Sequence, residues 1–184
     1  MSTNVVATTA RGTALVLKAA AFAAWKHRDQ RRKDAEASPY INHPLALAEV
    51  LSSEGKVTDP VVLAAALLHD TLEDTETTVE ELTGAFGRRI ADIVEEVTDT
   101  KWLKKATRKK LQVARASRSS KGAKLVKLAD KICNLRDLLA SPPSGWSIER
   151  IREYFDWAKS VIDRVRGTNA RLETRFDQLY RMRP

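Results

Sequence analysis

Apolar residues recur at helical spacing along most of the chain, and no segment of useful length shows the alternation typical of a half-buried strand. Residues 13–27 (TALVLKAAAFAAWKH) and 124–140 carry apolar residues at the spacing of helices. Residues 60–72 (PVVLAAALLHDTL) are apolar on nearly every face, so we expect this helix at the centre of the core. The pattern therefore predicts an all-α protein.

Polar stretches rich in Gly, Pro or Ser separate the predicted helices. Asp59 and Ser147 have the residue type and the position of N-caps. Further helices are expected over residues 43–53, from a capping box at 77–81 to Gly84, over 88–98, 106–116 and 147–166, and up to about Met182. None of the breaks has the composition of a domain linker. We therefore expect one helical bundle over residues 11–184, preceded by a flexible tail over residues 1–10.

The composition of the 184 residues is that of an ordinary globular domain, with 43% hydrophobic and 30% charged residues. No apolar run approaches the length of a membrane span, and the first residues lack the pattern of a signal peptide. The single cysteine, Cys133, can make no internal disulfide. These features predict a cytoplasmic protein. Core packing is expected for Cys133, Trp102, Trp146 and Trp157.

The formal net charge of +8 favours anionic partners, such as phosphorylated metabolites, nucleic acid or an acidic membrane, without choosing between them. Basic residues cluster at 28–33 (RDQRRK) and 101–110 (KWLKKATRKK). A solvated face accounts for most of them. The second cluster has Trp102 as its one aromatic residue, which makes it a poor platform for stacked bases.

Two of the three histidines lie in motifs that suit a metal site. His43 opens a predicted helix, His69 and Asp70 end the apolar one, and Asp130 adds a carboxylate within a later helix. Each motif alone is more often structural, because a His-Asp pair makes ordinary hydrogen bonds and Asp130 can be a solvated residue beside lysines. Together they form a set of N and O ligands without cysteine, which is typical of a divalent-metal hydrolase centre.

Two acidic residues follow the His-Asp pair by about one helical turn. Glu73 and Asp74 lie four and five residues after His69, so Glu73 can project toward the same catalytic water. A carboxylate in this place can accept a proton from the water or orient it. The other interpretation is a solvated acidic loop (EDTET), which fits Glu76 better than the first two residues.

Five ordered motifs carry a resemblance to a known family. They are RRKDAEASPYINHP (31–44), AALLHDTLEDT (65–75), EEVTD (95–99), GAKLVKLADKICNLRDL (122–138) and GWSIERIREYFDWA (145–158). With these motifs the chain resembles the HD-domain hydrolases of the RelA/SpoT homologue group. It is most similar to the stand-alone small alarmone hydrolases of the metazoan SpoT-homologue type, from about residue 20 to the C-terminus.

The resemblance implies a fold, an activity and a site. The fold is a single all-α HD-domain bundle. The activity is removal of the 3′-pyrophosphate from guanosine tetra- or pentaphosphate, which leaves GDP or GTP. The cofactor is manganese, and the partner is this anionic nucleotide rather than a nucleic acid or a membrane. By the same resemblance, the metal ligands are His43, His69, Asp70 and Asp130, the residues that serve the attacking water are Glu73 and Asp74, and the substrate contacts are Arg32, Lys33, Asn134, Arg150 and Tyr154.

The sequence departs from the bacterial bifunctional members of the family in one loop. After Lys33, residues 34–38 form a longer loop that lacks the usual glycine, so the shape of the chain beside the substrate phosphates is expected to differ. The larger members also carry a synthetase domain after the hydrolase, and none is expected here.

Two other functions compete with this one. A metal-dependent phosphatase that removes the 2′-phosphate of NADPH would present a ribose-linked phosphate to the same site. A basic nucleotide- or nucleic-acid-binding protein without catalysis would account for the net charge of +8. A degenerate site should have lost some of its residues, whereas every proposed metal and water-activating position holds a suitable one. The sequence therefore favours the hydrolase.

Overall fold

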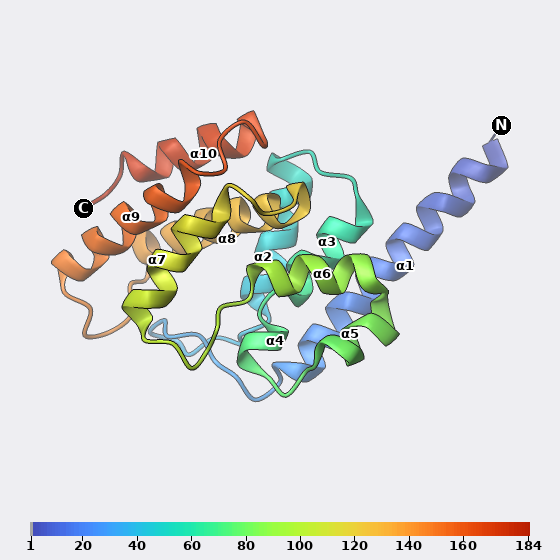
Figure 1. Cartoon of the computed structure of the whole chain (residues 1–184), viewed down its shortest axis with the longest axis horizontal. Helices are drawn as coiled ribbons and strands as arrows, with labels where there is room; N and C mark the ends of the chain where they lie inside the picture. The colour runs from blue at the N-terminus through green and yellow to red at the C-terminus, as the bar shows by residue number, and fades with distance from the viewer. Residues whose placement is uncertain (1) are drawn as a thin grey trace.

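The computed structural model describes the backbone of residues 2–184 and the side chains of residues 10–184 (Figure 1). This part of the chain contains no β-strand, and its one isolated β-bridge joins Arg31 and Pro39. Its helices are α1 (Ser2–Lys26), α2 (Asn42–Glu49), the π-helix η1 (Val50–Glu54), α3 (Pro60–Leu68), α4 (Thr71–Asp74), α5 (Val79–Phe86), α6 (Arg88–Val97), α7 (Lys105–Ala116), α8 (Lys121–Ala140), α9 (Ile148–Ile162) and α10 (Ala170–Tyr180). The prediction of an all-α fold is confirmed.

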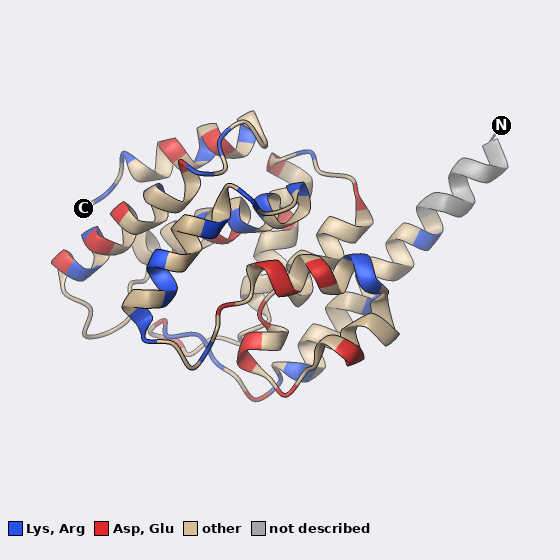
Figure 2. Cartoon of the chain, in the orientation of Figure 1, with Lys and Arg blue, Asp and Glu red and all other residues tan. Residues whose placement is uncertain are grey.

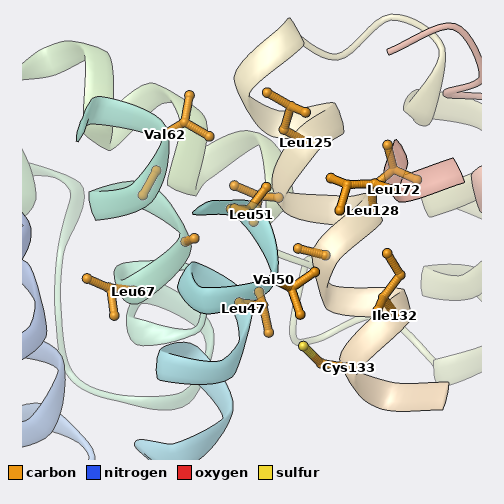
Figure 3. Packing of buried hydrophobic residues seen from close by; sticks show 14 of the residues in the cluster. Leu47, Val50, Leu51, Val62, Leu67, Leu125, Leu128, Ile132, Cys133 and Leu172 are labelled. Carbon is orange, nitrogen blue, oxygen red and sulfur yellow. The ribbon is translucent and has the colours of Figure 1, made fainter. Parts of the chain in front are cut away.

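Helix α3 lies at the centre of the bundle, as its uniformly apolar sequence predicts. It packs against α1, α2, α6 and α8. Figure 3 shows Leu47, Val50 and Leu51 of the α2–η1 segment between α3 and α8, and all three are buried. Burial of this apolar surface is the main force that holds the long helix α8 against the rest of the molecule.

A glycine lets α8 approach α6 closely. A Cβ atom added at Gly122 would lie 2.6 Å from Ile93 Cδ1 and 3.1 Å from its Cγ1, closer than carbon atoms pack. The absence of a side chain at this position therefore sets how near the first turn of α8 comes to α6.

Predicted N-caps are confirmed at two helices. Asp59 Oδ1 accepts a hydrogen bond from the N–H of Val61 at 2.9 Å, and Pro60 occupies the first helical position. Ser147 Oγ accepts one from the N–H of Arg150 at 3.3 Å, which starts α9. These local hydrogen bonds satisfy donors that the helices leave free at their first turns.

The helix predicted over residues 60–72 is divided in two. Helix α3 ends at Leu68 and α4 begins at Thr71. Asp70 between them has φ −97° and ψ −3°, and Thr71 Oγ1 donates to the carbonyl oxygen of Leu68 at 2.7 Å. The backbone therefore departs from the helical repeat of α3 at Asp70, which changes the direction of the Asp70 side chain.

The first helix also differs from the prediction. The backbone of α1 begins at Ser2, whereas a helix over residues 13–27 was expected after a tail at 1–10. Cys133 is buried and forms no disulfide, as expected. Among residues 2–184, none of the helices combines the length and the apolar character that crossing a membrane requires.

Lys127 of α8 is a buried amine, with 7% of its surface exposed. It lines a small cavity of about 20 Å³ together with Glu96, Asp99 and Arg108. Burial, with a contribution from the neighbouring Lys131, lowers the pKa of Lys127 to about 8. The protonated amine is therefore held at a cost in stability.

Replacing Lys127 by Met should stabilise the protein at pH 7 by about 1–3 kcal/mol, because a charged group is no longer buried. The pKa in the folded state, about 8, lies below the ordinary 10.5. The folded wild type thus loses this proton before the unfolded chain does, and its stability rises through that pH range. Urea unfolding of both proteins should show that Lys127→Met exceeds the wild type in free energy of unfolding by less at pH 10 than at pH 7. An equal difference at the two pH values would contradict the lowered pKa of Lys127.

Candidate active site

The four predicted metal ligands come together from three parts of the bundle. His43 lies in the first turn of α2, His69 and Asp70 lie between α3 and α4, and Asp130 lies midway along α8. The nearest ligand atoms of His43, His69 and Asp130 lie within 4.8 Å of one another. His43 Nε2 is 3.3 Å from Asp130 Oδ1, and His69 Nε2 is 2.9 Å from Asp70 Oδ2. His43, His69 and Asp130 therefore face one centre, and Asp70 lies beside it against His69.

The donor set fits a divalent cation. His69 Nδ1 lies 2.8 Å from the carbonyl oxygen of Ala66, which orients the ring so that Nε2 faces the carboxylates. In the described part of the chain, His43 Nδ1 is buried without a hydrogen-bond partner. Two imidazoles and two carboxylates without a thiolate suit a catalytic metal with open positions better than a closed structural zinc site. His43, His69 and Asp130 form a group able to hold a metal ion, and the carboxylate of Asp70 adjoins it.

Both carboxyl groups are held in their ionised form. Burial alone would raise the pKa of Asp130, but Lys131 and His43 lower it well below the usual range. Burial also opposes ionisation of Asp70, and His69 and His43 overcome it, so the pKa of Asp70 is lowered. Lys131 Nζ donates to Asp130 Oδ2 at 2.7 Å. The oxygens are therefore available as acceptors and ligands.

Tyr40 supports the centre from the loop before α2. Its hydroxyl donates to Asp70 Oδ2 at 2.5 Å and lies 3.4 Å from Asp74 Oδ2. Its ring packs against His27, with 4.8 Å between the ring centroids. His27 is thus a buried neighbour of the site and faces Gln30, with 2.6 Å between Nδ1 and Oε1. No local sequence pattern marks Tyr40 as part of the site, although it lies inside the motif PYINHP (39–44).

Glu73 and Asp74 face different surroundings. Asp74 lines a cavity beside the metal-binding group. The carboxylate of Glu73 accepts hydrogen bonds from Arg108 Nη1 at 2.8 Å and from the N–H of Asp99 at 3.2 Å. Burial raises the pKa of both acidic residues. The two residues predicted to serve the water are therefore not equivalent.

A cavity of about 770 Å³ opens beside the centre and includes His43 in its wall. Four of the predicted substrate residues line it, namely Arg32, Lys33, Asn134 and Tyr154. Arg32 forms an ion pair with Asp137, and Asn134 Nδ2 donates to Asp130 Oδ1 at 2.6 Å. The cavity thus joins cationic and amide donors to the metal-binding group.

Arg150 lies in a neighbouring cavity of about 500 Å³ rather than in the first one. Trp146 and Tyr154 line both cavities. The guanidinium of Arg150 lies over the Trp146 ring, 4.1 Å from its centroid, and Lys105 and Lys109 complete a basic wall. Trp146 packs against the core as a partly buried residue, as expected, and its ring also lines both cavities.

Trp102 departs from the expected core packing, because 88% of its surface is exposed. Trp157 packs against the core as a partly buried residue, as expected. Its indole N–H donates to the carbonyl oxygen of Lys109 at 3.2 Å, and the Lys131 ammonium lies over its ring at 4.3 Å. Trp157 thus joins α9 to α7 and α8.

The unusual loop after Lys33 is closed by its own side chains. Asp34 accepts hydrogen bonds from the N–H of Ser38 at 3.0 Å and from its hydroxyl at 2.5 Å. Ala37 has φ +49°, a left-handed conformation that glycine adopts more easily. The Asp34–Ser38 pair therefore holds a turn beside Arg32 and Lys33 without a glycine.

Replacing Tyr40 by Phe should weaken Mn²⁺ binding by about tenfold, because Asp70 loses a hydrogen bond that orients its carboxylate. Isothermal titration with manganese chloride measures the affinity. Tyr180→Phe is the matched control, since its hydroxyl donates to Asp156 at 2.9 Å, away from this centre. Equal affinities of the Tyr40→Phe and Tyr180→Phe proteins would show that Tyr40 does not support the centre.

Comparison with known proteins agrees with this geometry. The HD domain family matches residues 19–153. The chain is 58% identical over 167 residues to the guanosine-3′,5′-bis(diphosphate) 3′-pyrophosphohydrolase MESH1 of Xenopus tropicalis, covering 91% of this chain and 93% of that protein. The human MESH1 is 56% identical over 170 residues, with 92% and 95% covered.

A solved structure shares the fold over nearly its whole length. It is described as "A metazoan ortholog of SpoT hydrolyzes ppGpp and plays a role in starvation responses". The two structures align with a TM-score of 0.90 and 49% sequence identity, covering 92% of this chain and 96% of the other. The chain therefore belongs to the HD-domain family and, within it, to the metazoan SpoT homologues that include MESH1.

Proposed function

We propose that this protein is a manganese-dependent guanosine-3′,5′-bis(diphosphate) 3′-pyrophosphohydrolase. It consumes one water and converts guanosine tetra- or pentaphosphate to GDP or GTP plus pyrophosphate. One observation carries the proposal: His43, His69 and Asp130, with Asp70 against His69, lie together beside a cavity whose wall includes Arg31, Arg32 and Lys33. The relatives that share at least 56% of its residues over nine-tenths of its length bear the name of this activity.

The metal would be held by His43, His69, Asp70 and Asp130. When bound, a divalent cation lowers the pKa of a coordinated water and neutralises phosphate charge. The choice of manganese is supported by the family resemblance and by the two carboxylates, which are donors that this ion prefers.

The cavity residues divide into groups for phosphate and groups for the nucleoside. Arg32 and Lys33 lie where they would neutralise the charge of the 3′-pyrophosphate. Asn134 and Tyr154 would contact the nucleotide from α8 and α9. Arg150, stacked on Trp146, would reach it from the second cavity.

Asp74 is the better placed of the two acidic residues to accept the proton of the attacking water. It lines the cavity, whereas Glu73 faces Arg108. Burial, reinforced by the charge of Asp70, raises the pKa of Asp74. A carboxylate with a raised pKa is a stronger base near neutral pH.

A small anionic nucleotide is the proposed partner, with neither a nucleic acid nor a membrane required. A cytoplasmic location is supported by the single buried thiol, Cys133, which forms no disulfide.

The purified protein should release pyrophosphate from guanosine tetraphosphate with manganese, and a chelator should abolish the reaction. Asp70→Ala should lose turnover together with bound metal, because it removes a proposed ligand and leaves the buried His69 ring without its carboxylate partner. Phosphate release from NADPH is measured in parallel. Release of phosphate from NADPH, without pyrophosphate from guanosine tetraphosphate, would show that the protein is the NADPH phosphatase instead. Activity in metal-free Asp70→Ala protein would refute the metal mechanism.

Asp74→Asn should lower kcat by about 10²–10⁴-fold while leaving the bound manganese unchanged, because it removes the proton acceptor and keeps the shape of the side chain. Steady-state kinetics with metal analysis of the same samples separates the two effects. Asp92→Asn is the control, since Asp92 pairs with Arg88 on α6 outside the cavity. Wild-type kcat in the Asp74→Asn protein would remove Asp74 from the mechanism.

A further inference from the structure

We infer that Arg108 is a positioning residue that holds the carboxylate of Glu73, and that it affects hydrolysis only through this carboxylate. The inference rests on the proposed function, because it concerns the rate of that reaction. The Arg108–Glu73 ion pair joins α7, which borders the second cavity, to α4, which follows His69 and Asp70.

Glu73 is bound at both carboxylate oxygens and at its backbone. Arg108 Nη1 donates to Oε1 at 2.8 Å, and the N–H of Asp99 donates to Oε2 at 3.2 Å. Lys101 Nζ donates to the carbonyl oxygen of Glu73 at 2.8 Å. These contacts come from α7 and from the segment that leads into it, so they fix both the direction of the side chain and the end of α4.

Several of the charged groups around the Glu73 carboxylate are acidic. The charges of Asp99, Asp70 and Asp74 all oppose its ionisation, in addition to burial. Within residues 10–184, Arg108 supplies the one side-chain cation that pairs with this carboxylate. A guanidinium suits this task because it stays charged and donates along fixed directions.

Arg108 is itself held largely by this pair. Its side chain is 27% exposed, and the distance from Nη1 to Asp99 Oδ2 is 3.9 Å, beyond a hydrogen bond. In the part of the chain that the structure describes, its Nε is buried and has no hydrogen-bond partner. An unpaired buried donor opposes folding, so the bond to Glu73 is the contact that keeps the guanidinium in place.

The same helix carries Lys105 and Lys109, which line the second cavity on its other side. Figure 2 shows basic residues along α7 and acidic residues on α4 and α6. Helix α7 therefore meets the proposed nucleotide site with two lysines and meets Glu73 with Arg108. This arrangement makes the position of α7 a determinant of where the carboxylate of Glu73 is held relative to α4.

The test is a double-mutant cycle on kcat for pyrophosphate release. Arg108→Gln should lower kcat by about 10-fold or more with little change in KM, by analogy with the loss of a group that orients a functional side chain. Arg108→Lys, which keeps the charge, should recover part of the rate. In a Glu73→Gln background the Arg108→Gln change should have no further effect, because its target carboxylate is already gone.

Lys110→Gln is the matched control, since it removes one positive charge from an exposed position of the same helix. Circular dichroism melting verifies that each variant is folded. Three results would overturn the positioning role. They are an unchanged kcat in Arg108→Gln, a kcat that falls by the same factor in the wild-type and Glu73→Gln backgrounds, or a change in KM alone. The wild type is assayed first: its failure to release pyrophosphate would overturn the proposed function as well, whereas an active wild type confines any failure to Arg108.

Discussion

Two carboxylates held in a largely apolar interior impose the constraint on which the rest of this structure depends. An ionised aspartate is stable there only with hydrogen bonds and positive partners. Asp70 has His69 and the Tyr40 hydroxyl, and Asp130 has Lys131 and Asn134. His69, Lys131 and Asn134 are near neighbours of these carboxylates in the sequence, whereas Tyr40 lies 30 residues away from Asp70. The same compensation that makes the carboxylates tolerable in the core also makes them ligands, because their oxygens stay ionised and fixed.

The division between α3 and α4 follows from this constraint. Consecutive residues of a continuous α-helix point about 100° apart, and the change of backbone direction at Asp70 alters the angle between its side chain and that of His69. Asp70 adopts φ −97° and ψ −3°, a sparsely populated region common in active sites. His69 Nδ1 faces the carbonyl oxygen of Ala66, which satisfies a backbone group that the end of α3 leaves free. The apolar helix α3 thus ends next to His69 and Asp70, which are proposed to bind the metal.

Part of the positive charge of the protein is concentrated in one segment. The net charge of +8 indicated an anionic partner without locating it. No acidic residue occurs between Asp99 and Asp130, a stretch that contains the whole of α7. Part of this positive charge borders the second cavity through Lys105 and Lys109. Another part, Arg108, is turned inward to an acidic residue, so a basic segment serves both the cavity and the centre.

The sequence by itself determined the helical class, several helix starts and the types of residue that could bind a metal. Apolar periodicity reports which face of a helix is buried, and N-caps are local hydrogen bonds, so both could be read from neighbouring residues. The choice of His43, His69, Asp70 and Asp130 needed only residue types and spacing. The roles of Arg32, Lys33, Asn134, Arg150 and Tyr154 came instead from the family resemblance, because nothing local distinguishes them.

Only the tertiary structure decided which partners these residues have. Tyr40 meets Asp70 across 30 residues, and Arg108 meets Glu73 across 35, so neither pair leaves a local pattern. The separation of Glu73 from Asp74, the place of Arg150 in a second cavity and the exposure of Trp102 depend in the same way on how α4, α7 and α9 pack. Helical periodicity fixes the direction of a side chain relative to its own helix axis, whereas its contacts depend on the positions of other helices, which the packing of the whole core sets.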